Sequence, residues 1–98
     1  KYILDSLNPE RILIAAEALG IGKNALSRAV KYASDRIVFD RPIGQNQSIQ
    51  HPLAQNWIEL EAAELLIAKA WRTLRDKLYD ECLQKTQDAR DDDFTTIK

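Results

Sequence analysis

A run of residues spaced alternately by four and by three constrains the fold of this chain most strongly. Its members are Leu53, Trp57, Leu60, Glu64, Ile67, Trp71, Leu74 and Leu78. This spacing places the side chains on one side of an α-helix, so it predicts a helix over about residues 49–83 that packs against other helices at a shallow crossing angle. Glu64 is the one polar member, and we expect it either to reach the edge of this face or to meet a polar partner.

A second helical segment precedes this one and is predicted to span about residues 9–35. The Asn-Pro-Glu sequence at positions 8–10 has the residue types of a helix start, a capping side chain, a proline and an acid. Gly20 and Gly22 interrupt the helical pattern, and each costs roughly 1 kcal/mol at an exposed interior site. We expect another backbone to approach this face closely and compensate.

The connection between the helices is predicted over about residues 36–48, with Pro42 and Gly44 as its turn residues. The apolar pattern fades after the second helix, so residues 84–98 are predicted to form a polar tail, a loop followed by the start of another element. The chain begins with Lys1 and contains no methionine. We therefore expect it to be a piece of a longer or processed protein.

The composition supports an all-α fold in one small domain. The 98 residues are 45% hydrophobic and 30% charged, with only three glycines and three prolines. The predicted fold is a long helical hairpin. Two long helices cannot bury both of their apolar faces against each other, so the hairpin needs further helices of a parent protein or a second copy of itself. We expect self-association to complete a helical bundle.

Several classes of function and site are disfavoured. A net charge of −1 gives no basic surface for nucleic acid, and no apolar run reaches the length of a membrane span. Cys82 is the only cysteine, so an internal disulfide is impossible, and we expect this thiol to be buried rather than reactive. His51 is predicted to be a surface residue. The acidic run at 88–93 is predicted to be solvated, and no metal site is expected.

Three stretches together resemble the C-terminal helical domain of acyl-CoA dehydrogenases. They are ERILIAAEALGIG from Glu10, YASDRIVF from Tyr32 and RPIGQNQSIQHPLA from Arg41, and the resemblance covers about residues 7–71. It implies a flavoprotein that oxidises the Cα–Cβ bond of an acyl-CoA thioester and passes electrons to an acceptor. The chain would be the first helix hairpin of a four-helix domain, inactive alone, in an intracellular dimer or tetramer. The location would be cytoplasmic, or mitochondrial or peroxisomal in a eukaryote.

The resemblance also implies a set of contacts to FAD. In the family, residues matching Arg36, Phe39 and Gln47 reach across a subunit interface to the pyrophosphate and adenosine part of FAD. A guanidinium suits a pyrophosphate because it makes charge-assisted, often bidentate hydrogen bonds. The alternative is that the arginine solvates a helix end and the phenylalanine fills the hairpin. The family usually has glycine where this chain has Asp40, a carboxylate expected to point away or to pair with Arg41.

A catalytic base is implied at a second place. A minority of family members carry the glutamate that removes the α-proton at the position of Glu10, and most carry it later in the domain, past Lys98. Arg11 matches a supporting position, and Asn8 is a weaker candidate for contact with the CoA arm. The alternative for Glu10 is stabilisation of the helix start by the macrodipole. A competing function for the whole chain is a helical oligomerisation module without catalysis.

Overall fold

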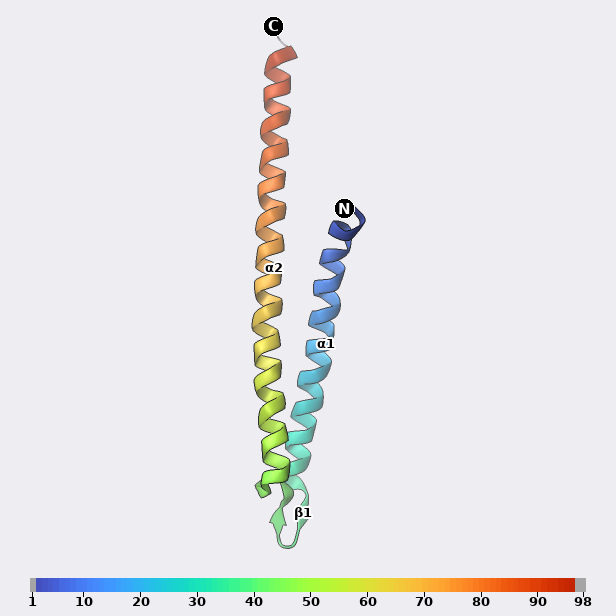
Figure 1. The fold of residues 1–98 in the computed structure, drawn as a ribbon, viewed down its shortest axis with the longest axis vertical. Helices are drawn as coiled ribbons and strands as arrows, with labels where there is room; N and C mark the ends of the chain where they lie inside the picture. The colour runs from blue at the N-terminus through green and yellow to red at the C-terminus, as the bar shows by residue number, and fades with distance from the viewer. Residues whose placement is uncertain (1, 97–98) are drawn as a thin grey trace.

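The computed structural model describes residues 2–96 and forms a single long hairpin of two helices (Figure 1). Two short antiparallel strands and one 3-10 turn, η1, connect the helices. In chain order the elements are α1 (Tyr2–Asp35), β1 (Ile37–Val38), β2 (Arg41–Pro42), η1 (Ile43–Gln45) and α2 (Gln47–Thr96). The two helices run antiparallel, and Figure 1 shows α2 extending well beyond the start of α1. This confirms the prediction of an all-α helical hairpin.

The hairpin is far more extended than a compact domain of its size. Its extents are 88 × 20 × 16 Å and its radius of gyration is 23.7 Å, against roughly 13 Å for a compact chain of this length. The accessible surface is 8642 Å², whereas a folded monomer of this mass exposes about 5,700 Å². A large apolar surface that a compact domain would bury is therefore exposed, as the sequence predicted.

The two helices meet along a narrow seam with little true core. Leu26 and Ala33 are the only buried hydrophobic residues in the described part of the chain. Gly22 lies at the closest approach, since a Cβ built there would stand 2.8 Å from Leu60 Cδ2. The expected close approach is thus present at Gly22, but it comes from a leucine side chain. Gly20 has nothing within 4 Å of its position, so the expectation was wrong for this residue.

The polar member of the seam on α2 has a partner on α1. Lys23 Nζ lies 2.5 Å from Glu64 Oε2, and both side chains are close to half exposed. Of the two alternatives for Glu64, the meeting with a polar partner is therefore confirmed. The two residues are 41 positions apart in sequence, so the pair is a direct link between the two helices across the seam.

The predicted start of the first helix was wrong. Residues 8–10 lie inside α1, which begins at Tyr2, so Asn8 does not cap the helix and Glu10 is not in its first turn. Pro9 lacks the N–H that would bond to the carbonyl of Asp5, one turn earlier. Asp5 is exposed, so water can satisfy this carbonyl, and the helix continues through the proline at the cost of one internal hydrogen bond.

The predicted polar loop was also wrong, because α2 continues through it to Thr96. Residues 84–93 contain no glycine or proline, and most have moderate to good helix propensity. Gln84 Nε2 donates a hydrogen bond of 3.0 Å to Asp88 Oδ1 one turn later, which supports the helix locally. No new element starts between positions 94 and 96, and positions 97 and 98 lie outside the described residues. Cys82, expected to be buried, is exposed on this part of α2.

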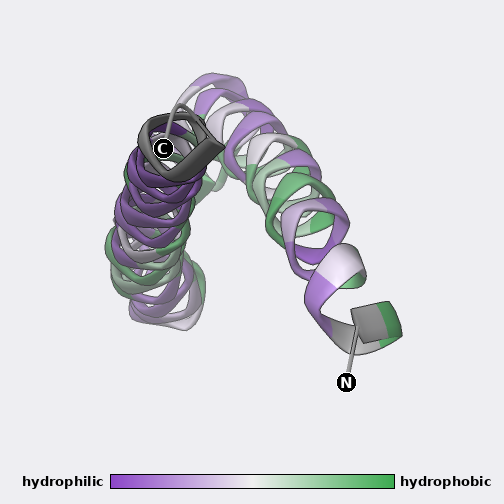
Figure 2. Ribbon diagram, turned by 90° about the horizontal axis from the view of Figure 1, so that it is seen from above, coloured by the Kyte–Doolittle hydropathy of each residue, from purple (hydrophilic) through white to green (hydrophobic). Residues whose placement is uncertain are grey.

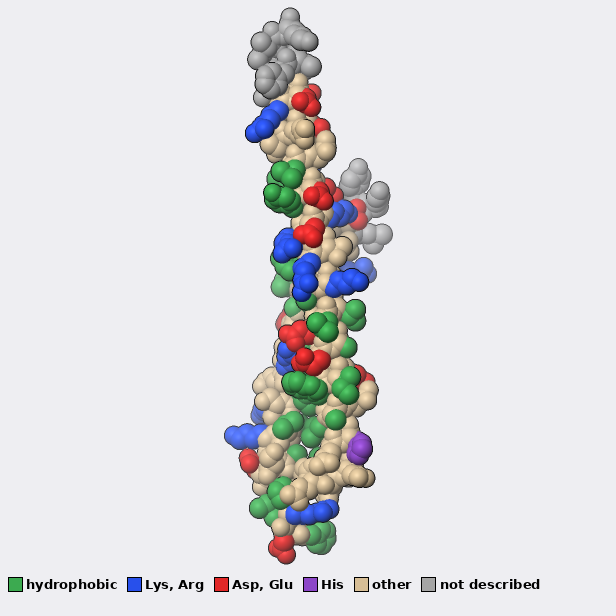
Figure 3. Space-filling view, turned by 90° about the vertical axis from the view of Figure 1, so that its left-hand side faces the viewer, with side chains coloured by type: hydrophobic (Ala, Val, Ile, Leu, Met, Phe, Trp, Pro, Cys, Tyr) green, Lys and Arg blue, Asp and Glu red, His purple; other side chains and the backbone are tan. Residues whose placement is uncertain are grey.

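Each helix carries a second apolar stripe on the side facing away from the other helix. The members, separated by one or two heptads, are Leu7, Ile14 and Ile21 on α1 and Ile58, Leu65 and Tyr79 on α2, all of them exposed. Each residue turns an α-helix by about 100°, so a residue two positions from a seam residue points about 200° away from it. Ile21, two positions after Leu19, and Ile58, two positions before Leu60, are examples. Figure 2 shows hydrophobic residues on the outer side of α1, and Figure 3 shows hydrophobic side chains spread along one face of the hairpin.

Within residues 2–96, no helix combines the length and apolarity needed to cross a membrane.

Candidate cofactor-binding site

The connection reverses direction at Phe39 and Asp40, in a two-residue turn between β1 and β2. Val38 pairs with Arg41 and Ile37 with Pro42 in the antiparallel register. Both turn residues have positive φ, 53° and 64°, which is the pattern of a type I′ hairpin turn. The prediction that Pro42 and Gly44 form the turn is therefore incomplete. They lie in the second bend, which leads through η1 into α2.

Backbone hydrogen bonds fix both ends of this connection. At the end of α1, the amide of Arg36 donates to the carbonyl of Tyr32 at 2.8 Å, and its own carbonyl accepts from Ile43 at 2.9 Å. Gly44 lies against the end of α1, because a Cβ built there would stand 3.0 Å from the carbonyl oxygen of Ala33. A larger residue at this position would push the connection away from α1.

The three residues expected to contact FAD all lie at this end of the hairpin. Phe39 stands at the tip of the turn with 96% of its surface exposed, so it does not fill the hairpin. Arg36 and Gln47 are also exposed, one directly after α1 and the other at the first residue of α2. No ion pair within residues 2–96 includes Arg36. The arrangement leaves a cation, an aromatic ring and an amide available to a molecule outside the chain.

Asp40 occupies a backbone conformation that suits glycine better than most other residues. A φ of 64° is unfavourable for most side chains and costs glycine little, although aspartate tolerates it better than most. Asp40 forms no ion pair with Arg41 among the described contacts. Arg41 Nη2 instead donates a hydrogen bond to Asn46 Oδ1. Of the two expectations for Asp40, pairing with Arg41 was therefore wrong. Sequence reasoning also missed the Arg41–Asn46 bond, because nothing in a five-residue spacing across a turn indicates it.

The residues considered for catalysis lie near the other end of the hairpin and do not all share a face. Asn8 and Arg11 line a groove of about 770 Å³ between α1 and α2, together with apolar residues such as Leu74. Glu10 does not line this groove and is exposed on a different side of α1. Because Glu10 is the ninth residue of α1, the helix macrodipole no longer explains its presence.

The two groups of candidate residues are far apart within one chain. Glu10 and Arg36 are separated by 26 positions, nearly all of them in α1, and a rise of 1.5 Å per residue places them about 39 Å apart. One site that used both groups of residues in the same chain would have to extend over this distance.

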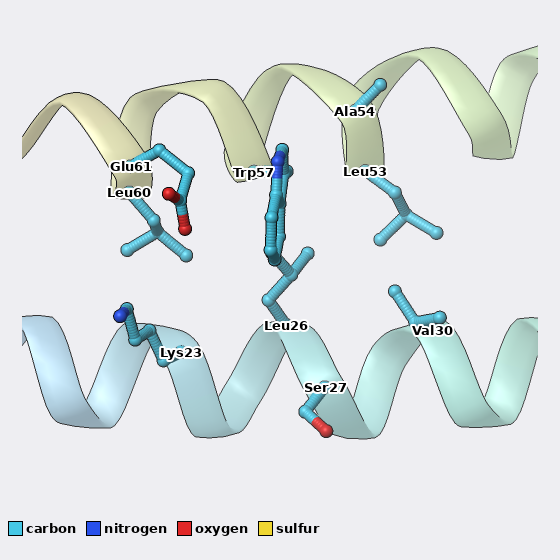
Figure 4. Close-up of a pocket in the computed structure, with 9 residues that line it drawn as sticks. All are labelled: Lys23, Leu26, Ser27, Val30, Leu53, Ala54, Trp57, Leu60 and Glu61. Atoms are coloured by element: carbon cyan, nitrogen blue, oxygen red, sulfur yellow. The ribbon is translucent and has the colours of Figure 1, made fainter.

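A second groove lies between the helices near the connection and is mostly apolar. Its volume is about 550 Å³, and Figure 4 shows Trp57 reaching into the space between the helices beside Leu26. Lys23, Ser27 and Glu61 supply its few polar atoms. Trp57 remains 57% exposed, which suits an anchor at an interface with another chain better than a core residue. His51 is exposed, as predicted. No group of potential metal ligands was found over the part of the chain that the structure describes.

Comparison with known proteins identifies the family. Residues 1–88 match the family described as "Acyl-CoA dehydrogenase, C-terminal domain". The chain is 51% identical over 69 residues to "Acyl-CoA dehydrogenase fadE12" of Mycobacterium bovis, covering 70% of this chain. It is 46% identical over 67 residues (68% of this chain) to "3-(aryl)acrylate reductase" of Clostridium sporogenes, and 41% identical over 70 residues (71%) to "Acyl-CoA dehydrogenase, short-chain specific" of Megasphaera elsdenii.

Each matched region is 18% of the relative's length, so the chain spans less than a fifth of these curated relatives. No solved structure gave a significant match. The family match nevertheless covers most of the chain, and the all-α hairpin agrees with a helical C-terminal domain. The chain therefore belongs to the acyl-CoA dehydrogenase family, as part of the C-terminal domain.

Proposed function

We propose that this chain forms part of a flavin-dependent dehydrogenase that oxidises the Cα–Cβ bond of an acyl-CoA thioester. Within that enzyme, the connection between α1 and α2 contacts the FAD held by a neighbouring subunit, and the helices pack in the core of the oligomer. The 98-residue chain alone is inactive. The relatives carry names with different substrates, so the proposal names the thioester class and no particular acyl group.

The observation that carries this proposal is the exposure of Phe39 on a strained turn. A phenylalanine that is 96% exposed in a positive-φ conformation contributes little to the hairpin's own stability. An aromatic side chain held out in this way suits contact with another molecule. Arg36 and Gln47 are exposed at the same end and have the chemistry to bind a pyrophosphate and a nucleoside by hydrogen bonds.

The charges and geometry of the hairpin end fit the phosphate part of FAD. Arg36 brings a permanent positive charge that no described ion pair neutralises, and the first turn of α2 contains no acidic residue. The positive end of the α2 macrodipole lies at Gln47 and also favours an anion. Asp40 is the one unfavourable charge in the turn, and its carboxylate would have to stay clear of the phosphates. FAD, when bound, supplies the acceptor for the hydride that leaves the β-carbon.

The distance between the two groups of residues supports contact across a subunit interface. Because about 39 Å separates Glu10 from Arg36, the connection serves the FAD of another subunit while α1 serves a site in its own subunit. There we assign to Glu10 the removal of the α-proton, which requires a carboxylate in reach of that proton. Arg11, next to Glu10 in the sequence, is assigned a supporting role, although it lines the groove with Asn8 that Glu10 does not line.

The test uses the full-length dehydrogenase that contains this chain, with FAD affinity as the readout. Arg36→Ala removes a charge-assisted contact, so the Kd for FAD should rise by roughly 10- to 100-fold. Arg28→Ala is the matched control, since Arg28 is an exposed arginine on α1 two turns before the connection. An unchanged FAD affinity in Arg36→Ala would remove this residue from the site. Glu10→Gln tests the base separately, because it should abolish oxidation while FAD remains bound.

A second candidate function is a helical module that only self-associates, and the apolar surface favours it. The chain exposes about 2,900 Å² more than a compact monomer of its mass, an area in the range that obligate interfaces bury. In sedimentation experiments, the chain should be a dimer or larger at micromolar concentration. Leu65→Lys, on the outer stripe of α2, should shift it towards the monomer, whereas Lys69→Ala should not. A folded wild-type monomer would contradict self-association.

A further inference from the structure

A hydrogen bond between two side chains ties the tip of the connection to the start of α2. Arg41 Nη2 donates to Asn46 Oδ1, and both side chains lie beside solvent. Arg41 directly follows the Phe39–Asp40 turn in the sequence. The carbonyl of Asn46 accepts hydrogen bonds from Ile49 and Gln50, so Asn46 caps the first turn of α2 with its backbone. The bond thus links the turn to the residue that fixes where α2 begins.

The turn needs such a link because its own structure is weak. Two consecutive non-glycine residues, Phe39 and Asp40, hold positive φ values, and such conformations persist only when the surroundings enforce them. The ladder beside the turn has only two residue pairs, and isolated two-stranded hairpins are marginal in water. Within the described residues, the Arg41–Asn46 bond is the only side-chain hydrogen bond in the connection over 36–48.

We infer that Arg41 and Asn46 are positioning residues, which hold the turn so that Phe39 is presented at a fixed place relative to Gln47. This inference rests on the proposed function, because it assigns the fixed turn a role in binding FAD. Neither residue has to touch FAD itself. If Arg41 were instead a direct ligand, Asn46 could be changed without effect on binding.

The first test measures the Kd for FAD in the full-length dehydrogenase for Arg41→Ala, Asn46→Ala and the double variant. Each single change should raise the Kd by about 2- to 10-fold, and the double change by no more than the larger single effect. The kcat at saturating FAD should stay at the wild-type value. Gln55→Ala is the control, since it removes a similar exposed bond of 3.1 Å to Glu59 elsewhere on α2. Additive effects, or no effect of Asn46→Ala, would overturn the inference.

The second test reads the turn directly in the FAD-free protein. The ¹³Cα and ¹³Cβ chemical shifts of Phe39 and Asp40 report their positive φ angles. In Asn46→Ala these shifts should move towards the values of a flexible chain, and in Gln55→Ala they should not. Unchanged shifts in both variants would overturn the inference whatever the affinity for FAD. If the shifts move but Arg36→Ala leaves the FAD Kd unchanged, the Arg41–Asn46 bond does hold the turn, and the proposed function fails.

Discussion

Leu60 of α2 covers Gly22 of α1 so closely that an added Cβ would stand 2.8 Å from its Cδ2 atom, whereas Gly20 faces open space. Gly20→Ala should therefore stabilise the chain by about 1 kcal/mol, the difference in helix propensity. Gly22→Ala gains the same propensity but must displace the end of the Leu60 side chain, so its net gain should be clearly smaller. Urea denaturation followed by circular dichroism, at one protein concentration, compares the two. Equal gains would show that the seam is looser than this contact indicates.

Asp40→Gly should stabilise the hairpin by about 1 kcal/mol, because glycine adopts a φ of 64° without steric cost. Asp40→Val should destabilise it, since a β-branched side chain is strongly disfavoured in this region. Asp80→Gly is the matched control on the exposed, helical part of α2, and it should cost about 1 kcal/mol. Thermal unfolding of the three variants measures these changes. A loss of stability in Asp40→Gly would mean that the aspartate makes a favourable interaction in this turn.

The Lys23–Glu64 pair should contribute only modestly, because both side chains are close to half exposed. A double-mutant cycle with Lys23→Ala and Glu64→Ala should give a coupling free energy of about 0.2–1 kcal/mol that shrinks in 1 M salt. The control is the cycle for Lys77 and Glu81, an exposed pair at 3.9 Å within α2, which should give a smaller coupling. A coupling insensitive to salt would indicate that hydrogen bonding rather than charge joins the helices.

The far end of α2 should unfold locally without loss of the hairpin. Gln87→Pro breaks the helix beyond the last residues that line a groove with α1. The helical circular dichroism signal should fall by the fraction of helical residues that follow position 87. The Tm of the hairpin should stay nearly unchanged. Ala63→Pro lies on a groove between the helices and should unfold the hairpin. A large drop in Tm for Gln87→Pro would show that this end packs against another part of the assembly.

The hairpin itself could be predicted from the sequence because the spacing of apolar residues indicates which side of each helix packs in the seam. Leu53, Leu60 and Ile67 recur every seven positions, and their side chains are partly buried against α1. The pattern also left Glu64 as the one residue in need of a partner, and Lys23 is that partner. A single apolar period therefore determined both the fold class and the packing face.

The start of α1 and the end of α2 were predicted wrongly, whereas the end of α1 at Asp35 agrees with the prediction. The end of α2 was missed because polarity was taken as a sign of a loop. Residues 84–93 are polar, but without a glycine or proline nothing stops the helix. Pro9 was taken as a helix start, although an exposed proline can also lie inside a helix. The turn at Phe39 and Asp40 was missed for a related reason. Neither residue type signals positive φ as strongly as glycine does.

The most direct test of the central claim is the structure of the full-length dehydrogenase with FAD bound. We predict that the guanidinium of Arg36 lies within about 2.7–3.2 Å of a pyrophosphate oxygen of FAD, and that this FAD is held by a neighbouring subunit. Phe39 and Gln47 should contact the same FAD. An Arg36 side chain in solvent, or an FAD contacted by the connection and by Glu10 of one and the same chain, would contradict the account.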